Sequence, residues 1–319
     1  MLNKKSAAFL VFLLTFGFYI YTLLPSLAWG DGVKLQSEAI AGESFVLAEM
    51  SPEQFSPDPF VFSRVGVAAW DHPLYIALGH LLVKAFPSTD SLWLVNSISA
   101  LFGAGSIAVV FLLAYNFTDS LFASGYASFS LALSHTFWWH SSTPEVYTLF
   151  VFLLLVSYYF FDQFEKSSQY VFLSWSAFFW GLAASTHVLA VLVVPALCLY
   201  FFLARGYRIS QIPHAKILLR PTVGFLAGFS LYLIQFIRMA ANFPLDEIMG
   251  PVVGSTFLSQ LGTLSPLILA ESSGTYLFFL LDAQVYNFSF CLLVNTHLCF
   301  LQSIVIHDLK EKILKDYPL

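Results

Sequence analysis

Eight apolar runs of roughly 20 residues each constrain this chain more than any other feature. A transmembrane helix needs about 20 apolar residues, and the chain is 58% hydrophobic and only 10% charged, far from the composition of a soluble domain. The sequence therefore predicts one all-α domain over 1–319, a polytopic transmembrane helical bundle of about eight spans, or nine if 264–281 also crosses. The predicted spans are 6–25, 91–115, 120–139, 145–162, 169–187, 188–204, 217–240 and 284–306.

The first apolar run has two interpretations. It follows Lys4 and Lys5 and precedes small residues at 26–28, a pattern that a cleaved signal peptide also has. However, the run is long for a signal peptide and contains Tyr19 and Tyr21. These features favour a retained first span.

The apolar segment 72–86 decides the predicted topology, because it is short for a span and typical of an interfacial helix. If it lies on the outer surface, ten of the 14 lysines and arginines are cytoplasmic, whereas only four are if it crosses. The positive-inside rule therefore predicts a multi-pass inner-membrane protein with a cytoplasmic N-terminus. It also predicts a large first extracytoplasmic loop, 26–90, that bears interfacial helices, and a second extracytoplasmic segment, 241–283.

Composition also excludes several classes of partner. The net charge of −5 is modest and dispersed, so no nucleic-acid partner is expected. The three cysteines lie within apolar runs, without the spacing of a disulfide framework or a metal site. No Asp-x-Asp pair is present, which disfavours a divalent metal ion; we expect no cofactor, and the use of a metal stays open at this point.

Two polar positions in the first loop suggest chemistry. Asp31 lies between two glycines just after the first span, where a carboxylate could act as a general base, or could cap a helix that begins near Val33. His72 precedes Pro73 at the start of the interfacial helix. Either Asp71 or His72 could cap this helix, or His72 and the helix amides could bind a phosphate.

Later candidates also have simple structural alternatives. Glu145 follows Thr143 and Pro144, a pattern that predicts a helix start with Thr143 as its N-cap, so Glu145 could merely complement the helix dipole. Residues 138–140 are typical of an aromatic belt at the interface. His187 could simply end a span, and Arg238 could extend its charge to the interface instead of binding an anion.

Taken in their order along the chain, these motifs resemble those of a known family. The elements are Asp31 after the first span, Asp71-His72-Pro73-Leu74-Tyr75, the span that begins Leu92-Trp93-Leu94-Val95-Asn96, Thr136-Phe137-Trp138, Glu145-Val146-Tyr147-Thr148-Leu149, and Gly181-Leu182-Ala183 before His187. Over roughly 5–205 the chain resembles a bacterial domain-of-unknown-function family allied to protein O-mannosyltransferases, within the GT-C membrane glycosyltransferases.

The resemblance implies a GT-C-like fold and an inverting glycosyltransferase. Such an enzyme moves a sugar from a polyprenyl-phosphate donor to a protein or glycan hydroxyl at the extracytoplasmic face of the bilayer. It implies that Asp31 and Glu145 are the catalytic carboxylates and that His72 holds the lipid phosphate. The remaining candidates for binding the substrate or the lipid phosphate are Asp71, Tyr75, Tyr147, His187 and Arg238.

Two other functions remain open. A transporter or flippase for a lipid-linked substrate would show repeated halves and ionisable groups near the midplane. Here no repeat is evident, and the clear charges lie at span ends, with Glu271 and Asp282 as the candidate exceptions. A non-catalytic membrane subunit is suggested by the first-loop motif Gly30-Asp31-Gly32-Val33-Lys34, where the family has Gly-Asp-Ser-Gly-Glu.

Overall fold

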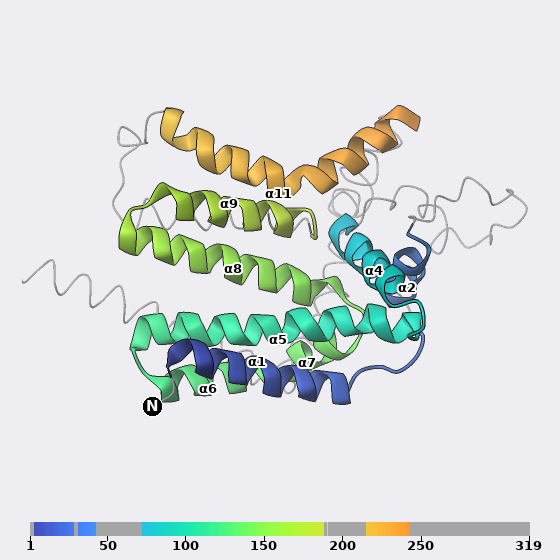
Figure 1. The fold of residues 1–319 in the computed structure, drawn as a ribbon, viewed down its shortest axis with the longest axis horizontal. Coiled ribbons are helices and arrows are strands. Elements are labelled where there is room, and N and C mark those ends of the chain that lie inside the picture. Colours follow the sequence, from blue (N-terminus) through green and yellow to red (C-terminus); the bar gives the residue numbers. More distant parts are fainter. Residues whose placement is uncertain (1–2, 29–30, 43–71, 188–189, 191–214, 243–319) are drawn as a thin grey trace, which may run out of the picture.

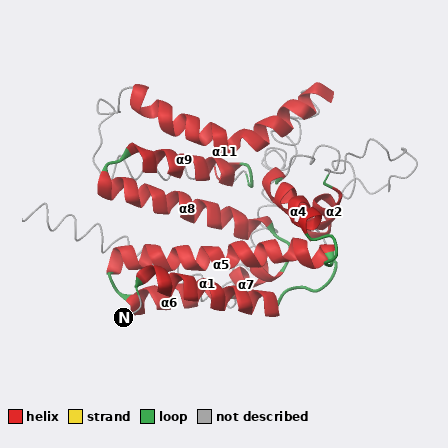
Figure 2. Cartoon of the chain, viewed as in Figure 1, coloured by secondary structure: helices red, strands yellow, loops and turns green. Residues whose placement is uncertain are grey.

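A computed structural model describes residues 3–28, 31–42, 72–187, 190 and 215–242. All secondary structure in these ranges is α-helical (Figure 2), so the all-α prediction is confirmed there. The helices are α1 (Lys4–Tyr21), α2 (Asp31–Ala41), α4 (Pro73–Ala85), α5 (Ser91–Thr118), α6 (Leu121–Ala132), α7 (His135–Ser142), α8 (Val146–Ser167), α9 (Tyr170–Ala184) and α11 (Ala215–Asn242).

Five helices lie side by side in the order α1, α5, α8, α9 and α11 (Figure 1). Helices α6 and α7 pack against α1 and α5. Local caps start several of these helices: the Asn3 side chain accepts from the Ser6 amide at the start of α1, and Asp90 accepts from the Trp93 amide at the start of α5. Buried apolar side chains of α2, α4, α5, α8 and α9 form the main hydrophobic core.

Within the described residues, three helices are long and apolar enough to cross a membrane: α1, α5 and α8. They correspond to the predicted spans 6–25, 91–115 and 145–162. Shorter apolar helices are α4, α6, α9 and residues 219–234 of α11. Nearly all of the predicted span 188–204, all of 284–306 and of the doubtful span 264–281, and most of the predicted external segment 241–283 lie outside the described residues. The count of eight spans therefore stays a prediction.

The predicted span 120–139 is wrong as a single helix, because the structure divides it into α6 and α7. The division falls at Ser134, whose extended backbone begins α7. The Ser134 hydroxyl donates to the Leu131 carbonyl oxygen at 2.9 Å and so satisfies a terminal acceptor of α6. Serine competes with helical hydrogen bonds in this way, which makes it more favourable at a helix end than inside a helix.

Helices α2 and α4 lie at the end of the bundle where α1 ends and α5 begins (Figure 1). They pack on each other closely, since a Cβ added at Gly79 of α4 would lie 2.6 Å from the Ala39 Cβ of α2. The His80 ring further joins the two helices through a 3.2 Å hydrogen bond between its Nδ1 and the Ala39 carbonyl oxygen. Helix α4 therefore lies at this end of the bundle, where it packs against α2 and the start of α5.

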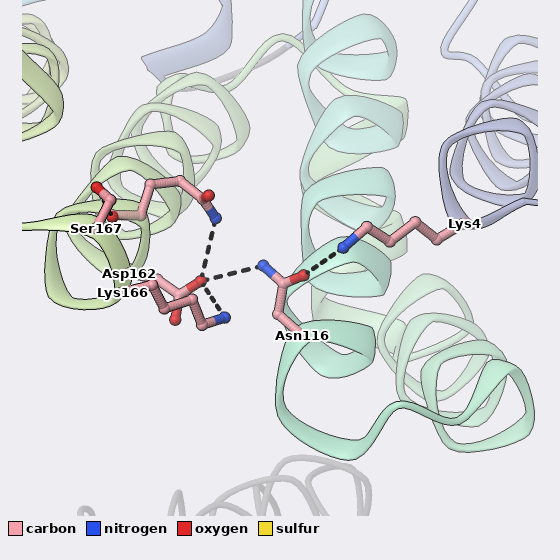
Figure 3. Close-up of polar contacts among 6 residues, drawn as sticks. Lys4, Asn116, Asp162, Lys166 and Ser167 are labelled. Atoms are coloured by element: carbon pink, nitrogen blue, oxygen red, sulfur yellow. Dashed lines mark hydrogen bonds and ion pairs between the residues drawn. The ribbon is translucent and has the colours of Figure 1, made fainter. Parts of the chain in front are cut away.

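A polar network joins three helices at the opposite end of the bundle (Figure 3). Lys4 Nζ donates to Asn116 Oδ1 at 3.1 Å, and Asn116 Nδ2 donates to Asp162 Oδ2 at 3.0 Å. Lys166 Nζ also donates to Asp162 Oδ2, at 2.8 Å. The start of α1 and the last turns of α5 and α8 therefore meet here, and Lys4 and Lys166 share one end of the bundle, as they do in the predicted topology.

We expect Asp162→Ala to lower the thermal unfolding temperature measurably, because its nearly buried carboxylate accepts hydrogen bonds from Asn116, Gln163 and Lys166. The expected loss is about 1–2 kcal/mol, reduced by the solvent exposure of Lys166. Thermal unfolding of the detergent-solubilised protein measures it. Gln163→Ala removes only one of these donors and should have a smaller effect; equal unfolding temperatures for Asp162→Ala and the wild type would contradict the prediction.

Candidate active site

The start of α2 lies beside the start of α8. Asp31 is the first residue of α2, and a Cβ added at the following Gly32 would lie 3.2 Å from Pro144 Cγ and 3.4 Å from Pro144 O. The backbone that carries Asp31 therefore passes next to the backbone that carries Glu145. The side chain of Asp31 lies outside the described part of the structure.

Two fully buried amides hold the connection between α1 and α2. Gln36 Nε2 donates to Asn96 Oδ1 at 2.7 Å, and Gln36 Oε1 accepts from the Ala28 amide at 2.9 Å. Asn96 Nδ2 donates to the Leu24 carbonyl oxygen at 2.8 Å. Because each amide group pairs with its neighbour or with the backbone, this network fixes where α2 begins, and hence the backbone position of Asp31.

Glu145 is the N-cap residue of α8, and Ser99 of α5 fixes its backbone. The Glu145 amide donates to Ser99 Oγ at 3.0 Å, and the Ser99 hydroxyl lies 3.1 Å from the Glu145 carbonyl oxygen. The prediction that Thr143 begins this helix is wrong. Thr143 has extended backbone, as residues before proline prefer, and its hydroxyl donates to the Trp139 carbonyl oxygen in the last turn of α7.

Tyr75 is fully buried below this position. Its hydroxyl donates to the Val95 carbonyl oxygen at 3.3 Å and lies 3.4 Å from Ser99 Oγ. Burial raises the pKa of Tyr75, the hydrogen bond to Ser99 lowers it, and the Glu145 charge raises it further. The neutral Tyr75 hydroxyl therefore belongs, with Ser99, to the buried support beneath the Glu145 backbone.

His72 precedes α4 with a left-handed backbone, φ 64° and ψ 43°. This conformation is uncommon for a residue with a side chain and costs about 1–2 kcal/mol. The capping interpretation for His72 is wrong, because its side chain makes no cap hydrogen bond. Its Nδ1 instead lies 2.6 Å from the carbonyl oxygen of Thr186, just after α9. Pro73 occupies the first turn of α4, as predicted.

Four rings from four parts of the chain form a row, which we call the ring row: His72, His187, Tyr147 and His140. The His72 and His187 rings stack with centroids 5.5 Å apart. The Tyr147 ring lies 5.4 Å from the His187 ring and 5.1 Å from the His140 ring. The ring row therefore joins the start of α4, the segment after α9, the first turn of α8 and the last turn of α7.

The predicted site residues that the structure describes with their side chains are His72, Tyr75, Glu145, Tyr147 and His187. The structure brings together His72, Tyr147 and His187 in the ring row, and it places Glu145 beside the start of α2. All of Asp71 and the side chains of Asp31 and Arg238 lie outside the described residues, although the backbone of Arg238 lies within α11. Among the described residues, no three histidines, cysteines or carboxylates are grouped as metal ligands.

Sequence reasoning missed His140 and the supporting residues Gln36, Asn96 and Ser99. The sequence pattern places His140 in an interfacial aromatic belt, whereas in the structure its ring contacts Tyr147. Asn96 and Ser99 lie within an apolar span, where polar side chains need a partner, and that is the signal that could have identified them. Gln36 has no comparable signal, because its neighbours in the sequence of the predicted first loop are also polar.

Residues 71–210 match the family model described as the protein O-mannosyl-transferase TMEM260 N-terminal domain. Over this range the chain is therefore similar to a mannosyltransferase-like family. The match supports the resemblance found in the motifs, and it supports the prediction that the protein is a transferase. The matched range contains His72, Glu145, Tyr147 and His187, and Asp31 precedes it. No curated protein and no solved structure matches the chain.

Proposed function

We propose that this chain is a GT-C-type glycosyltransferase of the membrane, which transfers mannose from a polyprenyl-phosphate carrier to a hydroxyl of a protein or glycan acceptor. The observation that carries the proposal is the meeting of Glu145, the start of α2 and the ring row at one end of the bundle. The match to a domain of a protein O-mannosyl-transferase supports the sugar and the reaction class.

The proposed chemistry is an inverting displacement at C1 of the sugar. Asp31 takes the proton of the acceptor hydroxyl as its oxygen forms the new bond to C1, and Glu145 orients that hydroxyl. The bond between C1 and the phosphate oxygen breaks, and polyprenyl phosphate leaves with the bonding electrons. His72 and His187 bind and position the phosphate, and the amides at the start of α4 stabilise its charge. We assign Arg238 to the same phosphate as a cation, and Asp71 to a substrate hydroxyl as a hydrogen-bond acceptor.

The proposed active site faces the extracytoplasmic side of the membrane. The distribution of lysine and arginine supports this orientation. The position of α4 at the end of the bundle where α1 ends and α5 begins also supports it, because an interfacial helix would lie at one end of the spans (Figure 1). The lipid chain of the donor would then lie in the outer leaflet, with its phosphate at the start of α4.

Glu145→Gln tests the proposal. Membranes that contain the protein would receive polyprenyl-phosphate mannose with a radiolabelled sugar, together with a serine- and threonine-containing peptide. We expect transfer by the wild type and a loss of about 10–100-fold in the variant, because the amide keeps the shape but not the charge that orients the acceptor.

Two outcomes would contradict the proposal. Full transfer by Glu145→Gln would remove the role assigned to this carboxylate. Movement of the labelled lipid across vesicles, without covalent transfer to peptide or glycan, would favour the transporter interpretation. Glu165→Gln is the matched control, because this glutamate lies near the opposite end of the same helix and should not affect transfer.

A further inference from the structure

His140 lies in the last turn of α7, at one end of the ring row. Its Nδ1 is covered and has no hydrogen-bond partner among the described residues. A covered N–H without an acceptor is rarer in proteins than a covered acceptor without a donor. The proton of the neutral ring is therefore carried on Nε2, which can donate to a ligand.

Tyr147 provides an apolar ring surface next to this donor. Its side chain is 39% exposed, and its ring meets the His140 ring edge to face at 5.1 Å. A sugar ring has apolar C–H faces and a rim of hydroxyl groups. A part-exposed aromatic ring beside a hydrogen-bond donor offers a partner to each of these features.

The two ends of the ring row differ in the charge of the ligand group that they favour. Burial lowers the pKa of His140, so its ring is neutral at pH 7. A neutral imidazole suits a hydroxyl group, whereas a phosphate is bound best by cations and by the amides at helix starts. His72 lies at such a start, and His140 lies at the other end of the row.

We infer that Tyr147 and His140 form the subsite for the sugar ring of the donor, with His140 donating to a sugar hydroxyl. This inference rests on the proposed function and divides its site into two parts: a phosphate part at His72 and a sugar part at His140. It also makes His140 a residue that determines which sugar is accepted, because a hydrogen bond from Nε2 can distinguish sugars by the position of one hydroxyl group.

The test compares a lipid that bears the sugar, polyprenyl-phosphate mannose, with one that lacks it, polyprenyl phosphate. Their dissociation constants would be measured with the full chain in nanodiscs, for the wild type, His140→Phe and His140→Gln. Phenylalanine keeps a ring against Tyr147 without a donor, whereas the glutamine amide donates from nearly the position of Nε2. His135→Phe is the matched control, because its ring lies against Trp138 on the same helix and outside the ring row.

We expect His140→Phe to weaken binding of the mannose-bearing lipid about fivefold, the value of one neutral hydrogen bond, and to leave binding of polyprenyl phosphate unchanged. His140→Gln should restore most of the affinity, and His135→Phe should bind both lipids normally. Equal affinities of His140→Phe and the wild type for the mannose lipid, or equal losses for both lipids, would overturn the subsite while leaving the proposed function intact. A wild type that binds neither lipid would overturn both.

Discussion

Gly228→Ala is expected to separate α9 from α11 and to leave little folded protein. The Gly228 backbone lies against the backbone of α9, so an added Cβ would meet the Phe178 carbonyl oxygen and lie 2.8 Å from the Leu182 amide nitrogen. These are backbone atoms of a helix, and no side-chain rotation removes the overlap. The opposing Gly181 of α9 meets the backbone of α11 in the same way, which is typical of small residues between membrane helices.

The expected cost of Gly228→Ala is about 3 kcal/mol or more, the upper range for overpacking. Thermal unfolding and size-exclusion chromatography of the solubilised protein measure it. Gly125→Ala in α6 and Gly17→Ala in α1 are matched controls, because a Cβ at either position meets no atom within 4 Å. Alanine there should be neutral or should stabilise the helix by up to about 1 kcal/mol. Similar unfolding temperatures for all three variants would refute this account of the α9–α11 contact.

The sequence identified the long helices because their length and hydropathy are properties of one segment. The predicted spans 91–115 and 145–162 correspond closely to α5 and α8. Mean hydropathy did not reveal the break at Ser134, because the apolar residues on either side of Ser134-His135-Thr136 keep the whole run apolar. It depends on one hydroxyl group that satisfies the end of α6, and on α7 packing against α5.

The site could be predicted as a set of candidates but not as an arrangement. His72, Tyr147 and His187 are far apart in the chain, and only the packing of α4, α8 and α9 brings their rings together. The capping interpretation of His72 was wrong because the local sequence pattern predicts a cap, whereas the His72 ring lies within hydrogen-bond distance of the Thr186 carbonyl oxygen, far along the chain. The sequence motif around Tyr75 likewise gives no sign that the Tyr75 hydroxyl is buried against α5.

Asp31→Asn is expected to reduce mannose transfer by about 10²–10⁴-fold, the usual contribution of a general base. Asparagine has nearly the same shape as aspartate but cannot accept the acceptor's proton at neutral pH. It is also well tolerated at a helix start, so α2 should still form, and the Gln36–Asn96 pair should still hold the connection before it. The loss should therefore appear in kcat, with the affinity for polyprenyl-phosphate mannose within about twofold of the wild type.

Asp90→Asn provides the matched control for this prediction. Asp90 also lies at a helix start at the same end of the bundle, where its carboxylate accepts from the Trp93 amide at 2.8 Å. Asparagine can make the same cap, so transfer should be unchanged. An equal loss of transfer in Asp31→Asn and Asp90→Asn would indicate a general effect of negative charge at this end of the bundle. If Asp31→Asn, but not Asp90→Asn, lost both donor binding and transfer, Asp31 would be assigned to binding the substrate. Because the start of α2 lies beside Glu145, a selective loss of kcat is the result that requires a carboxylate at Asp31 in the reaction itself.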